Sequence, residues 1–196
     1  MNYIKAFGLV AVVALAAMAF TATASATEVT SPAGTTYTGN IQVEATAAIR
    51  FHTGHLAYEC FTANAEGDID QQGSTVTAKG DIDGWIFGEC GSATVDVLKE
   101  GTVELHTEKG ESNGNGIITV SGSEVTGEGG GFHCVYSTNN TPIGTLTGSK
   151  TTKGKAVLDV SGAVPRTGGK SGIFCGSSSY VTGLYTVTSP SYLDVD

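Results

Sequence analysis

Short runs of alternating apolar and polar residues recur along most of this chain, and glycine-rich turns separate them. In the run 41–45, the apolar residues Ile41, Val43 and Ala45 take every second place. This period of two is typical of a strand that buries one face and exposes the other. Turn residues such as Gln72-Gly73 punctuate the runs, because glycine tolerates the backbone angles that tight turns need. The pattern therefore predicts a chain made of short strands.

The predicted strands follow one another at a spacing that is typical of sandwiches and barrels. They cover His55–Thr62, Ser74–Lys79, Asp81–Phe87, Gly116–Ser121, Gly131–Ser137, Ile143–Thr147, Ala156–Val164, Ser179–Thr188 and Tyr192–Val195. Thr94–Lys99 and Thr102–His106, joined by the turn Glu100-Gly101, are predicted to form a hairpin. The expected fold class is all-β, an antiparallel β-sandwich or open barrel of about 8–12 short strands.

The first 26 residues have the three-part pattern of a secretory signal peptide. Lys5 supplies the positive charge, Phe7–Phe20 is an apolar run, and Ala24-Ser25-Ala26 fits the small-x-small cleavage rule. A membrane anchor is the alternative, but the run is shorter than the roughly 20 residues that span a bilayer. We therefore expect a secreted protein, extracellular or at the cell surface, with no stable membrane insertion after cleavage.

Removal of residues 1–26 leaves 196 − 26 = 170 residues, enough for one domain with its own core. We expect a single secreted domain at 27–196, in which Thr27–Asn40 is a flexible arm or an edge strand. The precursor has 10 Lys plus Arg and 19 Asp plus Glu. Cleavage removes Lys5, so the mature charge is 9 − 19 = −10. This acidic excess argues against nucleic acid and anionic membranes as partners.

All four cysteines, Cys60, Cys90, Cys134 and Cys175, lie in the mature part. An even number in an exported chain predicts disulfides, and no C-x-x-C spacing points to zinc or redox chemistry. Two bridges among four cysteines allow three connectivities. Cys90 and Cys175 are each followed by Gly-Ser, and this internal echo favours the pairing of Cys60 with Cys90 and of Cys134 with Cys175.

The sequence Gly-Asp-Ile-Asp occurs twice, at Gly67–Asp70 and at Gly80–Asp83. Carboxylates beside glycine are possible calcium ligands, but the spacing of an EF-hand loop is not met. A wet strand face explains the same pattern, since alternate residues share one side of a strand. A hydrolase acting through Asp81 and Asp83 is a further alternative, although neighbouring carboxylates on one strand lie too close together for an inverting glycosidase.

His52 and His55 are a candidate copper or zinc pair, with His106 and His133 far away in the sequence. Their spacing across a Thr-Gly turn is generic. A serine hydrolase would need a G-x-S-x-G elbow, which the sequence lacks. We therefore predict no catalytic, metal-binding or cofactor-binding residue, no cofactor, and a protein that is not an enzyme.

Aromatic residues at alternate strand positions fit two interpretations, the packing of a core or a platform for a ligand. The set comprises Tyr58, Phe61, Trp85, Phe87, Phe132, Tyr136, Tyr180 and Tyr185. In β-rich chains such residues usually pack the core. If a ligand is bound, Trp85 and Tyr180 are the predicted contacts.

Several segments resemble a group of small exported bacterial all-β proteins of unknown function. They are Ser31–Thr35, Asn140–Gly148, Ala156–Gly169, Cys175–Ser178 and Tyr185–Pro190. The opening of the mature chain and the spaced cysteines are also similar to the secreted alkane-oxidation activator family. The resemblance implies export and a β fold, and it carries no active-site residue over to this chain.

Two functions follow from these observations. The first is a non-enzymatic β-domain, extracellular or at the cell surface, that acts by binding an unknown extracellular partner or itself. A free strand at Thr27–Asn40 would suit it, because an unpaired strand can add to the edge of a neighbouring sheet. The alternative is a soluble secreted binder of a small apolar molecule or a glycan, since sandwiches and barrels often hold such ligands.

Overall fold

The computed structural model describes residues 27–31, 34–73, 76–107, 114–170 and 174–196 of the 196-residue chain. The predicted signal peptide, residues 1–26, lies outside the described residues. The described part is all-β and antiparallel, which confirms the predicted fold class. The only helix described is α1, Ser149–Thr152. In the part of the chain that the structure describes, no helix has the length and apolar character needed to span a membrane.

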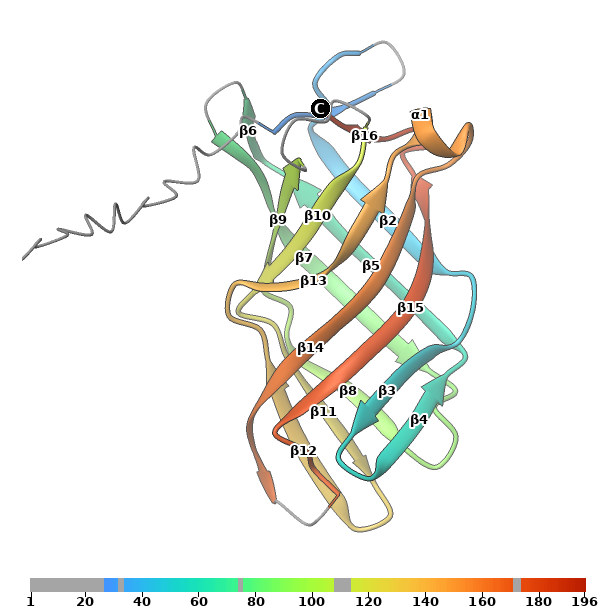
Figure 1. Ribbon diagram of the computed structural model, residues 1–196, viewed down its shortest axis with the longest axis vertical. Coiled ribbons are helices and arrows are strands. Elements are labelled where there is room, and N and C mark those ends of the chain that lie inside the picture. The colour runs from blue at the N-terminus through green and yellow to red at the C-terminus, as the bar shows by residue number, and fades with distance from the viewer. Residues whose placement is uncertain (1–26, 32–33, 74–75, 108–113, 171–173) are drawn as a thin grey trace, which may run out of the picture.

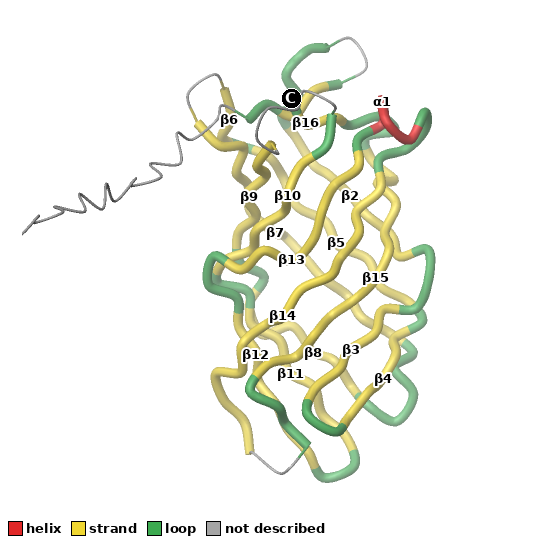
Figure 2. The backbone as a smooth tube through the Cα atoms, viewed as in Figure 1, coloured by secondary structure: helices red, strands yellow, loops and turns green. Residues whose placement is uncertain are grey.

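Most of the strands are short, and the longest are β7, β14 and β15 (Figures 1 and 2). Their bounds are β1 Val29–Thr30, β2 Gly39–Ala45, β3 Ile49–Thr53, β4 Leu56–Cys60, β5 Thr62–Ile69, β6 Gln71–Gly73, β7 Val76–Gly88, β8 Thr94–Lys99, β9 Thr102–Thr107, β10 Gly116–Ser121, β11 Glu124–Gly129, β12 Phe132–Ser137, β13 Thr141–Thr147, β14 Val157–Lys170, β15 Ser178–Ser189 and β16 Asp194–Val195.

Eight of these strands close into a ring, which makes the body barrel-like. Going round, β15 pairs with β2, and β5, β7, β9, β10, β13 and β14 follow in turn. β14 then pairs with β15 and completes the circuit. We call this part, which is at the top in Figure 1, the upper half. Eight strands enclose an interior that side chains fill or that holds one small ligand.

The lower half is built on the same two long strands, β14 and β15. Beyond its pairing with β13, β14 pairs with β12, and β11 and β8 follow outward. The first residues of β15 pair with β3, which pairs with β4. β4 and β8 are therefore the two end strands of the sheet path. Figure 1 shows β3 and β4 on one side of the lower half and β8, β11 and β12 on the other.

The predicted hairpin between Thr94–Lys99 and Thr102–His106 is wrong. The first run is β8, which pairs with β11, and the second is β9, which pairs with β7 and β10. At the turn between them, Gly101 has a φ of +83°, a conformation that glycine adopts at little cost. The Gly101 carbonyl accepts a hydrogen bond from Ile82 N at 3.0 Å. The chain thus crosses here from the lower half to the upper half.

The two Gly-Asp-Ile-Asp sequences lie side by side on β5 and β7. Gly67 faces Ile82, and a Cβ atom on Gly67 would overlap with the Asp81 carbonyl oxygen. A Cβ atom on Gly80 would overlap in the same way with the Asp68 carbonyl oxygen. Each glycine therefore allows the close approach of the opposite strand, and neither ends a strand. This is why two predicted strands at 74–79 and 81–87 form a single β7.

Segments from the two ends of the described chain meet over the upper half (Figure 1). β1 pairs with β16, where Val29 faces Val195, and both side chains are fully buried. We call residues 27–31 and 190–196 the terminal cap. In the predicted arm at 27–40, β1 is thus paired within the chain, and residues 32–33 lie outside the described residues.

Both predicted disulfides are confirmed, with the favoured connectivity. Cys60 bonds to Cys90 and Cys134 bonds to Cys175. Cys60 ends β4, and Cys90 lies in the connection that leads from β7 to β8. Cys134 is in β12, and Cys175 lies in the connection from β14 to β15. Both bridges therefore belong to the lower half.

Candidate functional site

A mainly apolar cavity of about 160 Å³ lies inside the ring of the upper half and extends to Phe51, Val125 and Tyr136 of the lower half. Every strand of the ring contributes to its lining. Most of the lining side chains are aliphatic and include Ile41, Val43, Ile69, Ile82, Val103, Leu105, Ile118, Val120, Ile143, Leu146, Leu158, Val160 and Val187. These are the inward residues of the alternating runs, so the pattern that predicts the strands also makes the interior apolar.

Small residues on β5 leave room beside the large aromatic residues of β7. Ala65 lies opposite Trp85 and Ala63 lies opposite Phe87 in the antiparallel pairing. Ala65, Trp85 and Phe87 all line the cavity. The lining is mainly apolar, and its polar members are Glu66, Asp68, Ser123, Tyr136 and Thr138. A mainly apolar cavity of this size can accept a small apolar ligand, as an engineered cavity of roughly 150 Å³ that binds benzene demonstrates.

A row of five aromatic rings runs from the cavity into the lower half. Trp85 contacts Phe87 with ring centroids 6.0 Å apart, and Phe87 meets Phe51 edge-on at 5.5 Å. Phe51 stacks on Tyr58 at 5.1 Å, and Tyr58 stacks on Phe132 at 6.2 Å. These offset and edge contacts are the arrangements that aromatic pairs prefer. The row connects the cavity with the packing of the lower half.

The structure does not bring the two predicted ligand contacts together. Trp85 lines the cavity, whereas Tyr180 is 45 % exposed on the outer face of β15. The Tyr180 hydroxyl is hydrogen-bonded to the Ser161 hydroxyl at 2.6 Å. Its neighbours Ser179 and Val181 point inward instead, because successive side chains on a strand alternate between faces. Trp85 remains a predicted ligand contact, and Tyr180 is not among the described residues that line this cavity.

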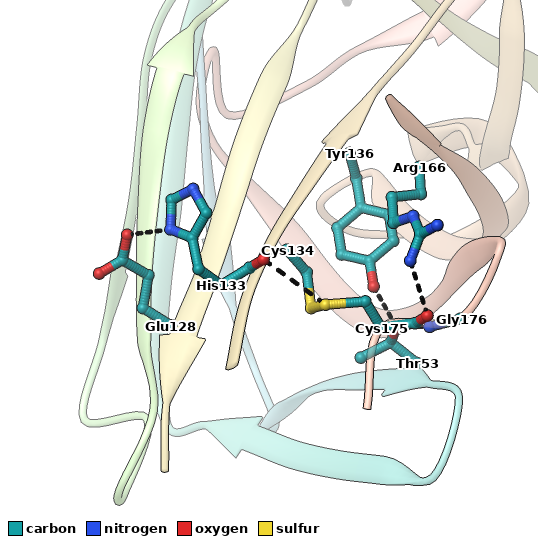
Figure 3. The surroundings of a disulfide bond; sticks show 8 residues. All are labelled: Thr53, Glu128, His133, Cys134, Tyr136, Arg166, Cys175 and Gly176. Atoms are coloured by element: carbon teal, nitrogen blue, oxygen red, sulfur yellow. Dashed lines mark hydrogen bonds and ion pairs between the residues drawn. A yellow bond between two sulfur atoms is a disulfide. The ribbon is translucent and has the colours of Figure 1, made fainter. Parts of the chain in front are cut away.

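At the lower end of the cavity, several of the inward-facing side chains carry hydroxyl groups. Tyr136 of β12 and Thr53 of β3 are buried and share a hydrogen bond between their hydroxyls (Figure 3). The Thr53 hydroxyl also accepts a hydrogen bond from Gly176 N at 3.1 Å. Burial raises the pKa of Tyr58, and the neighbouring Tyr136 raises this pKa further. Tyr58 is therefore a neutral hydroxyl at any physiological pH.

The terminal cap covers the other end of the cavity. Leu193 is almost fully buried and lines the cavity. The cap is tied to α1, since Lys150 N donates to Asp194 Oδ1 at 2.9 Å and Lys150 Nζ lies 2.8 Å from Asp196 Oδ2. Thr30 Oγ1 also donates to Asp196 Oδ2, at 2.9 Å. Polar contacts at the rim thus hold an apolar cap over an apolar interior.

The other candidate residues lie on the outer surface. Asp81 and Asp83 are exposed on β7, and His52 and His55 are exposed at the β3–β4 turn. Within the described ranges, no three His, Cys, Asp or Glu side chains gather in a way that could hold a metal ion. The wet-face interpretation agrees with the placement of the second Gly-Asp-Ile-Asp repeat, whereas Asp68 of the first repeat is half-buried and lines the cavity.

Comparisons of the chain with family models, with curated proteins and with solved structures gave no match. The fold and the cavity therefore define the class of this protein by themselves. It is an all-β, disulfide-bonded, barrel-like protein with an apolar cavity inside its ring of strands.

Sequence reasoning missed the cavity, its cap and the hydroxyl groups below it. The residues of each strand that face inward can be read from the sequence once the strands are known. In β5, for example, Ala63 and Ala65 alternate with polar residues. That these residues surround a single cavity depends on the pairing of strands far apart in the sequence, such as β2 with β15. A search for strands whose inward positions carry unusually small residues would have pointed to β5.

Proposed function

We propose that this protein is a non-enzymatic binder of a small apolar molecule, which it holds inside the ring of the upper half. The cavity of about 160 Å³ carries this proposal. Its size corresponds to a compact ligand of about the dimensions of benzene. Each Å² of apolar ligand surface that is removed from water contributes about 25 cal/mol of favourable binding free energy. Because so small a molecule has little surface, we expect its affinity to be modest.

Of the two ligand classes expected from the sequence, the apolar molecule has the better support. A sugar carries many hydroxyl groups, and each buried hydroxyl needs a hydrogen-bond partner. The lining around Trp85 is dominated by aliphatic side chains, which offer none. The compartment in this proposal is extracellular or at the cell surface. The two disulfides support it, because such bonds persist in oxidising compartments.

A surface module that self-associates is the second candidate. Leu98 is 53 % exposed on the end strand β8, which favours it. Two observations weigh against strand addition as its mechanism. β1 is already paired with β16, and β8 carries Lys99 paired with Glu124 at 3.4 Å, a type of charge that protects sheet edges from pairing.

The test is the binding of benzene and cyclohexane to the disulfide-intact protein. The emission of Trp85, the single tryptophan of the chain, and ligand-observed NMR would report binding. The variant Ala65→Leu puts extra methyl groups into the cavity and is expected to lower the affinity by about tenfold or more. The matched control is Ala57→Leu, the same change at an exposed position of β4, which is expected to bind like the unmodified protein.

Two results would contradict the proposal. One is the absence of saturable binding by the unmodified protein for either probe. The other is unchanged affinity in a folded Ala65→Leu variant, because the probes would then bind elsewhere.

A further inference from the structure

A second, smaller cavity of about 20 Å³ lies in the lower half next to the main one. The two cavities share five lining residues, which shows that they adjoin: Phe51, Val125, Tyr136, Val164 and Val181. A space of this size holds roughly one water-sized group. It is too small for a ring or a chain of carbon atoms, but large enough for a single oxygen.

Ser179 gives this small cavity a polar wall. Its side chain is 2 % exposed and lines the cavity. The Ser179 hydroxyl oxygen is buried and has no hydrogen-bond partner among the described residues. Ser179 lies directly opposite Thr53 on β3 and opposite Val164 on β14. Its hydroxyl therefore projects toward the region where Thr53 and Tyr136 meet.

An unpartnered buried hydroxyl is unusual, because more than nine in ten comparable groups in proteins are satisfied. The Thr53 hydroxyl is already engaged by Tyr136 and by Gly176 N. Ser179 can both donate and accept a hydrogen bond. The remaining hydrogen-bonding capacity at this end of the interior thus points at the space next to the apolar cavity.

The lining of the small cavity also fixes the charge of what it accepts. Its described residues include Tyr58, Tyr136, Thr126 and Ser179 as polar members, and no Lys, Arg, His, Asp or Glu. Burial of an ionised group without a partner of opposite charge is strongly unfavourable. A neutral oxygen is therefore the compatible group, and a carboxylate or an ammonium is not.

We propose that the small cavity is the seat of one neutral oxygen of the ligand, a hydroxyl or a carbonyl, and that Ser179 is its hydrogen-bond partner. This inference rests on the proposed function, because the apolar body of the same molecule fills the main cavity. The ligand class is thus a compact apolar alcohol or ketone with its oxygen at one end.

The experiment compares two probes of nearly equal shape, benzyl alcohol and ethylbenzene, which differ by a hydroxyl in place of a methyl group. Dissociation constants are measured by calorimetry for the unmodified protein, for Ser179→Ala and for the control Ser161→Ala. Ser161 also carries a serine hydroxyl, but it lies on the outer face, bonded to Tyr180. Ser179→Ala is expected to raise the dissociation constant of benzyl alcohol about tenfold. The dissociation constant of ethylbenzene should stay within about twofold of that for the unmodified protein. Ser161→Ala should change neither.

The outcomes separate this inference from the proposed function. If both probes bind and Ser179→Ala affects them equally, or affects neither, the seat for a neutral oxygen is wrong, while the apolar site stands. If benzoate binds more tightly than benzyl alcohol, the site accepts a carboxylate and the inference is overturned. If neither neutral probe binds the unmodified protein, the proposed function itself fails.

Discussion

The upper and lower halves of this molecule are closed by different means. In the upper half, eight strands hydrogen-bond in a complete circuit, and no described disulfide lies there. In the lower half, the sheet path ends in β4 and β8, which do not pair with each other. The Cys60–Cys90 bridge joins the end of β4 to the connection that leads into β8. A disulfide thus links the two ends of the sheet path, where hydrogen bonding between strands stops.

The difference shows how one strand pair can support two kinds of interior. β14 and β15 run through both halves and face each other at nine positions, from Val157 with Thr186 to Pro165 with Ser178. Above, their inward residues, such as Leu158 and Val187, line an apolar space. Below, Val164 and Ser179 border the small cavity, and Ser179 contributes a hydroxyl group to its wall. β14 and β15 pair with β13 and β2 in the upper half and with β12 and β3 in the lower half. This change of partner strands gives the apolar interior one polar end.

The largest expected effect comes from removal of the Cys60–Cys90 bridge by the double variant Cys60→Ala, Cys90→Ala. Loss of a bridge across 30 residues is expected to lower the free energy of unfolding by about 3–4 kcal/mol in the chain-entropy description. Denaturant unfolding measures this change. Amide hydrogen exchange should show faster opening in β4 and β8 than in β9 and β10, and equal acceleration in all four strands would break the comparison of the halves.

Alkaline pH is expected to have the next largest effect, through one buried tyrosine in each half. Burial raises the pKa of Tyr58 in the lower half and of Tyr185 in the upper half above the usual value of 10.0. Above about pH 10 the unfolded chain loses these protons while the folded protein keeps them. The unfolded state then binds fewer protons, so stability falls as pH rises, by about 1.4 kcal/mol per pH unit for each tyrosine.

Urea unfolding between about pH 9 and pH 11.5 tests this prediction. Tyr58→Phe and Tyr185→Phe should each reduce the dependence on pH, whereas Tyr180→Phe, at an exposed position, should leave it unchanged. A smaller contribution to this pH dependence from Tyr58 than from Tyr185 would sharpen the comparison of the two halves. It would mean that the lower half opens before the upper half. No loss of stability in this range would contradict the burial of both hydroxyls.

The smallest expected effect concerns the terminal cap. Lys150 contacts Asp194 and Asp196, but its side chain is 47 % exposed. Pairs at such exposed sites contribute about 0–1 kcal/mol. Lys150→Met is therefore expected to lower global stability by at most about 1 kcal/mol, and to speed amide exchange at Glu28 and Asp196, which hydrogen-bond across the cap. The control is Lys155→Met at an exposed position nearby, and an identical effect of both variants would mean that Lys150 does not hold the cap.

The strands could be predicted from the sequence because their alternation is local. Ile41, Val43 and Ala45 reveal one face of β2 without knowledge of its partners. The hairpin prediction failed because Glu100-Gly101 looks like any tight turn, although the strands on its two sides join different parts of the sheet. The break predicted between Lys79 and Asp81 is wrong for a similar reason. A glycine required for close strand approach and a glycine required for a turn are the same in sequence.

The site could be predicted only in part. Trp85 is one of the two predicted ligand contacts, and it lines the cavity. Tyr180 is the other, but it lies on the outer face, because the face of a strand on which a residue lies depends on its position in the alternation. Ser179, one residue earlier, has the inward place. Its missing partner could not be inferred, because Thr53 and Tyr136 approach it only after β3 and β12 are placed.

The terminal cap also has a consequence for the order in which the molecule assembles. Its hydrogen bond between Thr30 and Asp196 joins residues 166 positions apart. In an unfolded chain, closing a loop of this length costs about 2–3 kcal/mol more entropy than closing a ten-residue hairpin. The cost becomes small once the intervening strands have brought the two segments together. The cap is therefore expected to close last in folding, when Val29, Leu193 and Val195 join the buried core of the ring.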